Sequence, residues 1–172
     1  MKLPTIEAIP VWLTPPEKEF FDADEKAQLE AIFARILPED RARQIPGARR
    51  IGVADFVSRL LGMADETYYE LPAWRALYRA ALPALEGWAK ATHGKGLASL
   101  DDASMNSLIA SLEAGNLANA PAELKEPQKV FGTLLRHCYH GAFSDPRWGG
   151  NRDKMMWRAM GYLQPAENVF DE

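Results

Sequence analysis

The sequence predicts an all-α fold: a compact single domain of about six helices over residues 22–172, preceded by an extended N-terminal arm over residues 1–21. Apolar residues recur at intervals of three and four along most of the chain, which is the spacing of one face of an α-helix. No segment alternates apolar and polar residues as a half-buried strand does, so we expect little or no sheet. A chain of 172 residues can bury a core without disulfides or metals.

The composition excludes several classes of protein. The single Cys rules out an internal disulfide and any zinc or iron–sulfur site built from several cysteines. The formal net charge of −4 argues against a nucleic-acid-binding protein, which carries a basic excess. No apolar run approaches the roughly 18 residues of a membrane span, so none is expected.

The first residues predict an extended arm, because proline restricts both its own backbone and that of the preceding residue. Trp12 lies in an apolar part of this arm and needs a surface, either on its own domain or on a partner. No basic segment followed by an apolar stretch marks a signal peptide. The prolines of the arm are Pro4, Pro10, Pro15 and Pro16.

The first two helices have clear ends. Asp22 followed three residues later by Glu25 has the form of a capping box, and Pro38 stops the helix that follows. Val53 opens the second apolar stripe, and Gly62 is well placed to end that helix. The inward stripe of the first helix is Leu29, Ile32, Phe33 and Ile36, and that of the second is Val53, Phe56, Val57, Leu60 and Leu61.

The third and fourth helices follow. The third runs from about Leu71 to Lys90 and contains Pro83, so we expect a kink or two helices that meet there. Asp101 or Asp102 caps the fourth helix, and Gly115 ends it.

The last part of the chain predicts a polar surface loop over 116–126, then a fifth helix with Pro127 in its first turn. Cys138 falls on the buried stripe of this helix. A final helix is expected to start near Asn151, and its inward residues are Met155, Met156 and Met160.

The stretch 137–151 breaks the amphipathic pattern, and a turn-rich loop between apolar helices often carries function. One interpretation is a metal site, with His137 and His140 on one helix face and Asp145 or Asp153 as a third ligand. Another is a nucleophilic Cys138, activated by a neighbouring cation.

Two further interpretations concern the glycine pair in this stretch. Gly149, Gly150 and Asn151 would open a helix whose free N–H groups attract an anion, with Arg147 and Arg152 adding charge. No Lys-Ser/Thr pair follows the glycines, so this is not a nucleotide-binding P-loop.

The fourth interpretation is structural. Asn151 would cap the last helix, the glycines would supply positive φ, and Asp145-Pro146 would set a turn. Three aromatic side chains would then pack the loop onto the body of the protein or onto another chain: Trp148, Phe143 and Tyr139.

Residues 141–153, GAFSDPRWGGNRD, followed by Trp157 and Gly161-Tyr162, resemble the C-terminal signature of the gluconate 2-dehydrogenase subunit 3 family. Residues 35–38, 46–48 and 52–57 resemble the opening of that family, so the resemblance covers about residues 22–162. His140 stands where the family usually has Glu, and Met156 stands where it usually has Gly.

This resemblance implies a non-catalytic small subunit that stabilises, matures or co-exports a large FAD-dependent dehydrogenase of the glucose–methanol–choline type. The large subunit would oxidise sugars, sugar acids or glycosides, with a cytochrome c subunit as a further partner. FAD is expected in the partner and no cofactor in this chain, which has no dinucleotide fingerprint, no cysteine set for a cluster and no haem-attachment motif. The resemblance implies a periplasmic complex; the absence of a visible signal peptide favours the cytoplasm instead.

Aromatic and Arg side chains are enriched at the centres of interfaces, so Trp74 and Tyr139 are also candidates for the partner surface. Two rival hypotheses stay open: a stand-alone helical enzyme or metal-binding protein that uses His137, His140 and Asp145, and a homo-oligomeric helical scaffold. The candidate interface and signature residues are His137, His140, Ser144, Asp145, Pro146, Arg147, Trp148, Gly149, Gly150, Asn151, Arg152 and Trp12.

Overall fold

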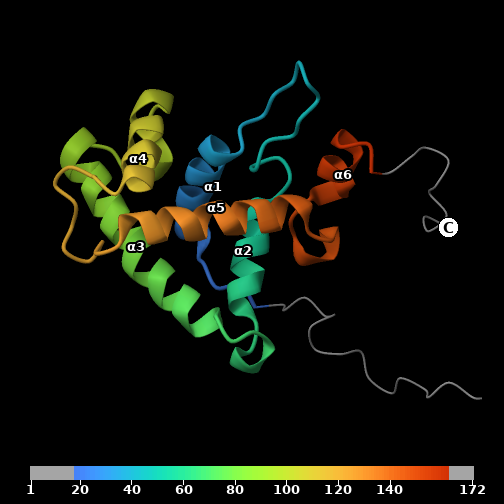
Figure 1. Cartoon of the computed structure of the whole chain (residues 1–172), viewed down its shortest axis with the longest axis horizontal. Coiled ribbons are helices and arrows are strands. Elements are labelled where there is room, and N and C mark those ends of the chain that lie inside the picture. Colours follow the sequence, from blue (N-terminus) through green and yellow to red (C-terminus); the bar gives the residue numbers. More distant parts are fainter. Residues whose placement is uncertain (1–17, 163–172) are drawn as a thin grey trace, which may run out of the picture.

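The computed structural model describes residues 18–162, and over this range the fold is all-α, as predicted (Figure 1). Trp12 and most of the expected N-terminal arm lie outside the described residues. A single isolated bridge between Asp40 and Ile45 is the only β-type pairing in this range. The helices are α1 (Ala23–Ile36), α2 (Val53–Gly62), α3 (Leu71–His93), α4 (Asp102–Ala114), α5 (Pro127–Phe143) and α6 (Met155–Ala159).

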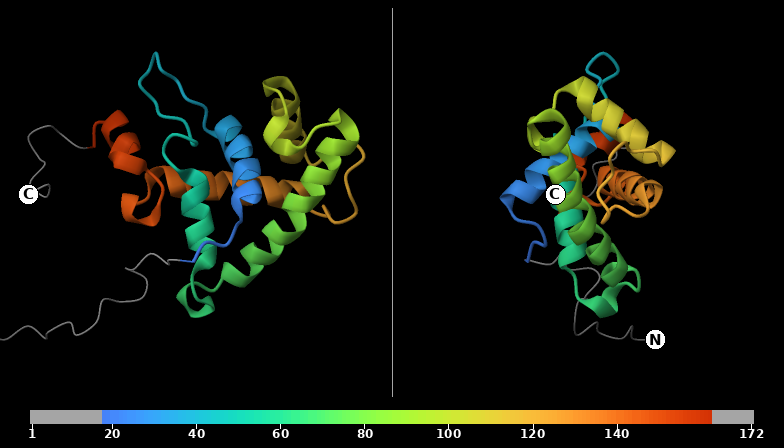
Figure 2. Two further views of the ribbon diagram at one scale, coloured as in Figure 1. Left: turned by 180° about the vertical axis from the view of Figure 1, so that it is seen from behind. Right: turned by 90° about the vertical axis from the view of Figure 1, so that its left-hand side faces the viewer.

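Helix α5 is the central element, and the other helices pack around it. It crosses the whole molecule in Figure 1, with α4 packed on it and α2 crossing it near its C-terminal part. The loop over residues 37–52 and α6 lie together at one end, and α4 and the C-terminal part of α3 lie at the other, as Figure 1 and the left view of Figure 2 show. The signature sequence therefore lies at the α2–α6 end of the molecule.

Helix α1 begins as its sequence predicts. The Glu25 N–H donates to Asp22 Oδ1 at 2.8 Å, and the Asp22 N–H donates to Glu25 Oε2 at 3.1 Å, which completes the capping box. Three residues of the predicted stripe, Leu29, Ile32 and Phe33, are fully buried. The capping box and the apolar spacing thus both specify a helix that starts after Asp22 and buries this stripe.

Helix α3 continues through Pro83, so the expectation of two helices meeting there is wrong. Proline costs an interior hydrogen bond, here the one that the Arg79 carbonyl would accept. Both Pro83 and Arg79 are exposed, so water can satisfy that carbonyl. The helix also runs past the predicted Lys90 to His93, and Gly94 ends it at a φ of 67°.

The loop over 116–126 is not simply a polar surface loop. Leu117 and Leu124 are buried, and Trp88 Nε1 donates to the Ala118 carbonyl at 2.9 Å. The two leucines bury apolar area that an exposed loop would leave in water. They therefore anchor the connection between α4 and α5 to the core.

The last helix starts at Met155 and not near Asn151. Asp153 and Lys154 have φ of 54° and 56°, which no right-handed helix includes, so a short turn with left-handed residues precedes α6. Met156 is buried as expected, but Met160 is 55% exposed because α6 ends at Ala159.

The segment before α1 is tied to α2 by Ser58, which is fully buried. Its hydroxyl oxygen accepts the N–H groups of Phe20 and Phe21, both at 3.1 Å. The Phe21 ring then packs edge-on against Tyr78 of α3 at 5.4 Å. Ser58 thus joins the segment before α1 to α2, and Phe21 extends this contact to α3.

No helix between residues 18 and 162 combines the length and the apolar character that crossing a bilayer requires.

Replacing Ser58 with Ala should lower the free energy of unfolding by about 1–3 kcal/mol, because the buried N–H of Phe21 loses its acceptor. Urea denaturation followed by circular dichroism measures this change. Ser107→Ala, on the exposed face of α4, is the matched control and should change stability by less than about 0.5 kcal/mol. Equal stabilities for the two variants would contradict the prediction.

Candidate partner interface

Residues 144–152, which we call the signature loop, leave the end of α5 and cross to α6 against the start of α2. The Arg152 N–H donates to the Ile51 carbonyl at 3.1 Å. On the other side, the Arg59 guanidinium donates to the Arg147 carbonyl at 3.4 Å. The loop is therefore held at two places, by a main-chain hydrogen bond just before α2 and by a side chain of α2.

Glycine is required where this loop touches its neighbours. A Cβ on Gly150 would overlap the carbonyl oxygen of Gly141 in α5. A Cβ on Gly52, at a φ of 76°, would lie 2.5 Å from the Gly149 carbonyl oxygen, and Gly149 itself has a φ of 95°. Gly150 and Gly52 thus permit the close approach of three backbone segments, and Gly149 supplies a positive φ.

Asn151 closes the signature loop from inside. It is fully buried, at a φ of 44° that Asn tolerates better than most residues. Its amide N–H donates to the Ser144 carbonyl at 3.1 Å, and its Oδ1 accepts the Met156 N–H at 2.9 Å. The expected cap at Asn151 is therefore corrected: this side chain serves the first turn of α6 from outside the helix, across the intervening turn.

Asp145 and Arg147 form a compact unit at the turn. Asp145 Oδ1 accepts the Arg147 N–H and its Nε, both at 3.0 Å, and Oδ2 accepts from Arg147 Nη2 at 2.9 Å. This hydrogen bonding to Arg147 holds the pKa of the Asp145 carboxyl below its usual value. Pro146 opens the short turn that Asp145 caps. The predicted turn is present, and its acid and base neutralise each other.

Arg152, which the anion-binding interpretation requires as a free positive charge, forms an ion pair with Asp55. Arg152 Nη2 lies 3.0 Å from Asp55 Oδ2, and Lys26 approaches the other oxygen of Asp55 at 3.4 Å. Both arginines of the loop therefore face carboxylates of the same chain. No long helix starts at the glycine pair, so the arrangement expected for anion binding is not formed.

His137 is a core residue. It is fully buried, with its Nδ1 at 3.0 Å from the Tyr78 hydroxyl and its ring edge-on to Trp74 at 4.5 Å. Its Nε2 is buried without a hydrogen-bond partner among the described residues. Burial lowers the pKa of the imidazole to about 3, so the ring is neutral at physiological pH.

The other reactive side chains do not assemble around His137. The His140 ring lies 6.2 Å away, centre to centre, while Asp145 is bound to Arg147. Within residues 18–162, no three His, Cys, Asp or Glu side chains are arranged to hold a metal ion. Cys138 is buried, and burial raises the pKa of its thiol to about 12, which disfavours the nucleophilic thiolate.

Four aromatic side chains lie on the segments that flank the loop, and we call them the aromatic face: Tyr139 and Phe143 on α5, Trp157 on α6 and Tyr162 just after it. Tyr139 and Phe143 are 46% and 42% exposed, and their rings are parallel at 6.2 Å. Trp157 Nε1 donates to the Phe143 carbonyl at 3.1 Å, and its ring meets Tyr162 at 5.7 Å. The sequence pointed to Tyr139 and Phe143, whose spacing of four places both on one helix face, and to Trp157 and Tyr162 only as part of the family signature.

The other tryptophans predicted for the interface lie elsewhere. Trp74 is buried against His137, and Trp148 is partly buried against the core. Trp12 lies outside the residues that the structure describes.

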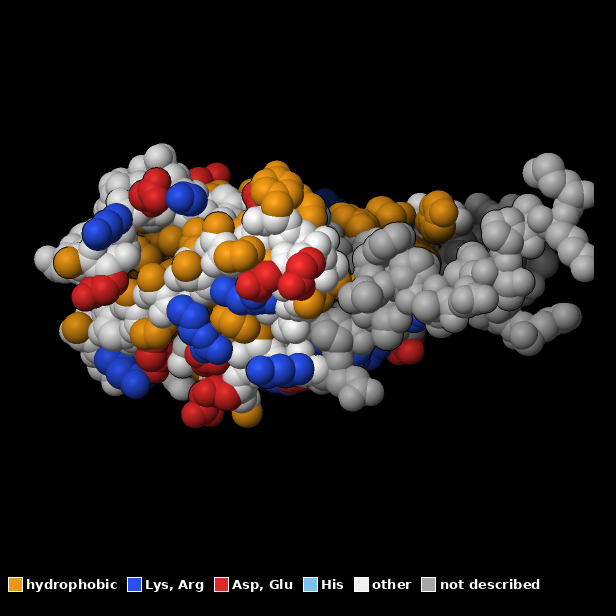
Figure 3. All heavy atoms as spheres, turned by 90° about the horizontal axis from the view of Figure 1, so that it is seen from below, with side chains coloured by type: hydrophobic (Ala, Val, Ile, Leu, Met, Phe, Trp, Pro, Cys, Tyr) orange, Lys and Arg blue, Asp and Glu red, His pale blue; other side chains and the backbone are white. Residues whose placement is uncertain are grey.

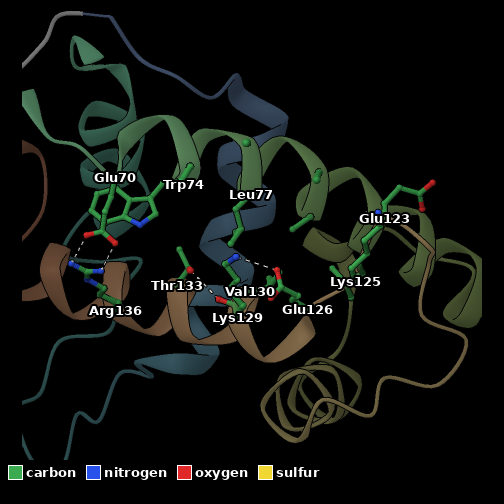
Figure 4. A pocket seen from close by; sticks show the side chains of 15 residues that line it. Glu70, Trp74, Leu77, Glu123, Lys125, Glu126, Lys129, Val130, Thr133 and Arg136 are labelled. Atoms are coloured by element: carbon green, nitrogen blue, oxygen red, sulfur yellow. Dashed lines mark hydrogen bonds and ion pairs between the residues drawn. The ribbon is translucent and has the colours of Figure 1, made fainter. Parts of the chain in front are cut away.

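A second surface feature is a groove of about 600 Å³ between α3 and α5 (Figure 4). Leu77 and Val130 lie in its middle, and the ion pair between Glu70 and Arg136 stands at one end. Figure 3, seen from below, shows apolar side chains exposed on the described surface with charged groups among and around them. Alanines make up much of its lining: Ala73, Ala76, Ala80 and Ala81.

Comparison with known proteins finds one family. The sequence model of the family described as gluconate 2-dehydrogenase subunit 3 matches residues 23–164, a range that contains all six helices and the signature loop. No curated protein and no solved structure matches the chain.

Replacing Asn151 with Ala should lower the free energy of unfolding by about 2–4 kcal/mol, because the Ser144 carbonyl and the buried Met156 N–H both lose their partner. Asn151→Gly should cost less, since Gly accepts the positive φ while losing the same hydrogen bonds. Thermal and urea unfolding measure both variants. The exposed Asn106→Ala on α4 is the control, and an equal effect there would refute the assignment.

The His137 imidazole should stay neutral down to about pH 5, because its pKa is near 3 in the folded chain. The unfolded chain takes up this proton near pH 6.5, so this group lowers stability as pH falls below 6.5, by at most about 1.4 kcal/mol per pH unit. Imidazole ¹⁵N chemical shifts between pH 5 and 8 measure the charge. A charged His137 ring at pH 6 would contradict the burial argument.

Proposed function

The chain belongs to the gluconate 2-dehydrogenase subunit 3 family, as its signature predicted, and we propose that it is a non-catalytic accessory subunit of a multi-subunit dehydrogenase. Its partner is a large FAD-dependent dehydrogenase of the glucose–methanol–choline type that oxidises a sugar, a sugar acid or a glycoside. This chain stabilises, matures or co-exports that partner. FAD belongs to the large subunit, and a cytochrome c subunit takes the electrons.

The observation that carries this proposal is the family match over residues 23–164. The internal use of the signature residues supports it. Asp145 binds Arg147, Asn151 joins α5 to α6, and Arg152 binds Asp55. Groups committed to the fold in this way suit a subunit whose task is to present a surface.

The aromatic face is the surface that we propose for the large subunit. Tyr, Trp and Phe are enriched in interface cores, and Ala is depleted there. This difference favours the aromatic face over the alanine-lined groove between α3 and α5. The aromatic face also adjoins the signature loop, because the Trp157 indole donates to Phe143 at the end of α5.

We propose the periplasm as the site of the complex, in line with the family, and the cytoplasm as the alternative. Cell fractionation that follows both subunits together decides between the two compartments.

Co-expression tests the role of the chain. The large dehydrogenase encoded beside this chain is produced with and without it, and solubility, flavin content and activity with an artificial electron acceptor are measured. We expect the large subunit to be soluble, flavinated and active only in the presence of this chain. A large subunit that is fully active alone would show that the accessory role is wrong.

The double variant Tyr139→Ala and Phe143→Ala should raise the Kd for the large subunit at least tenfold, because truncating a central aromatic contact costs about 2 kcal/mol or more. Biolayer interferometry with the purified large subunit measures the Kd. Tyr69→Ala removes an even more exposed aromatic side chain at the far end of α2 and should leave the Kd unchanged. Equal losses in both variants would place the interface elsewhere.

A further inference from the structure

A cleft of about 620 Å³ lies between the loop over 39–50 and α6. Three arginines line it, Arg41 and Arg50 from the loop and Arg158 from α6, together with the carboxylate of Glu39. The loop and α6 stand side by side at the same end of the molecule in both Figure 1 and Figure 2. Apolar side chains complete the lining: Ile45, Pro46, Met155 and Ala159.

The loop that carries two of these arginines has a fixed backbone. Asp40 and Ile45 exchange two main-chain hydrogen bonds, both at 2.9 Å, and Asp40 Oδ1 also accepts the Arg43 N–H at 3.0 Å. A Cβ on Gly47 would lie 2.7 Å from the Glu39 nitrogen, so Gly47 lets the two arms of the loop close on each other. A preformed loop loses less entropy when it binds a ligand.

The cleft is lined by more positive charges than negative ones, three arginines against one glutamate. Glu39 lies between Arg41 Nε at 2.6 Å and Arg50 Nη1 at 3.7 Å, and hydrogen bonding to Arg41 lowers the pKa of its carboxyl. One carboxylate cannot occupy the five N–H donors of each guanidinium. Arg158 pairs with no carboxylate of the described chain. The lining therefore keeps a net positive charge.

The surroundings of the cleft strengthen this field. Residues 39–59 and 144–162, which build this end of the molecule, contain nine Lys and Arg against five Asp and Glu. Their net charge of +4 contrasts with the −4 of the whole chain. A polarised charge distribution steers a partner of opposite sign toward the basic end.

The apolar part of the lining decides which kind of anion fits. A peptide brings carboxylates together with apolar side chains, whereas the phosphate backbone of a nucleic acid offers nothing that would pack on Ile45 and Met155. We propose that the cleft binds an acidic segment of the large subunit, whose carboxylates meet Arg50 and Arg158 while an apolar side chain lies against Met155. This rests on the proposed accessory role, and it adds a second contact next to the aromatic face, since α6 contributes to both.

The test is charge reversal in the complex isolated through a tag on this chain. The double variant Arg50→Glu and Arg158→Glu should raise the Kd for the large subunit at least tenfold, and added salt should weaken the wild-type complex. Lys90→Glu with Lys95→Glu makes the same change of net charge at the opposite end and should leave the Kd unchanged. Circular dichroism melting should be alike for all three proteins.

A photo-crosslinking side chain at Gln44, an exposed residue that lines the cleft, identifies the occupant. We expect crosslinks to an acidic stretch of the large subunit, and reversing those acids to Arg should restore binding to the double variant. Crosslinks to residues 163–172 of this chain, to a second copy or to nucleic acid would overturn the proposal.

Different results would contradict the cleft proposal and the accessory role. If the large subunit co-purifies and the double variant binds it as tightly as the wild type, the cleft proposal is wrong and the accessory role stands. If the wild-type chain recovers no large flavoprotein, the accessory role is wrong, and the cleft proposal falls with it.

Discussion

The structure depends on one steric constraint, the close approach of the signature loop to α2 and α5. Gly150 passes the Gly141 carbonyl with no room for a side chain, and Gly52 passes the Gly149 carbonyl in the same way. Only glycine allows backbone to meet backbone this closely. Because the chain crosses here, α6 is brought back against α5, and Asn151 can bridge from Ser144 to the new helix.

This constraint separates the polar groups of the loop from its aromatic neighbours. The charged side chains pair with each other at the surface, Arg152 with Asp55 and Arg147 with Asp145. The rings stay outside, as the exposed pair of Tyr139 and Phe143 illustrates. The same placement of α6 brings Arg158 to the loop over 39–50 and so creates the basic cleft. An accessory subunit needs such a division, because its signature can hold its own fold while its surface remains free to bind.

The residues that suggested chemistry are explained largely by burial. His137 and Cys138 lie on the inward side of α5, and the low dielectric of the core disfavours their charged forms. The sequence correctly placed Cys138 on a buried stripe. It did not show that His137 would also be buried, with a hydrogen bond to the Tyr78 hydroxyl of α3, because the two residues are 59 positions apart in the sequence.

The sequence by itself determined the family, the all-α class and the ends of the first two helices and of α4, because caps, proline stops and apolar spacing act within a few residues. Asp22 with Glu25 and the glycine after α4 are examples. Tertiary structure alone decided four features. Helix α3 continues through Pro83, and Leu117 of the α4–α5 loop is buried. Helix α6 starts only at Met155, and Arg50 and Arg158 line the same cleft. Each of these features depends on which side of a helix faces solvent or on contacts between segments far apart in the sequence. The free energy of such contacts cannot be read from a local stretch of sequence.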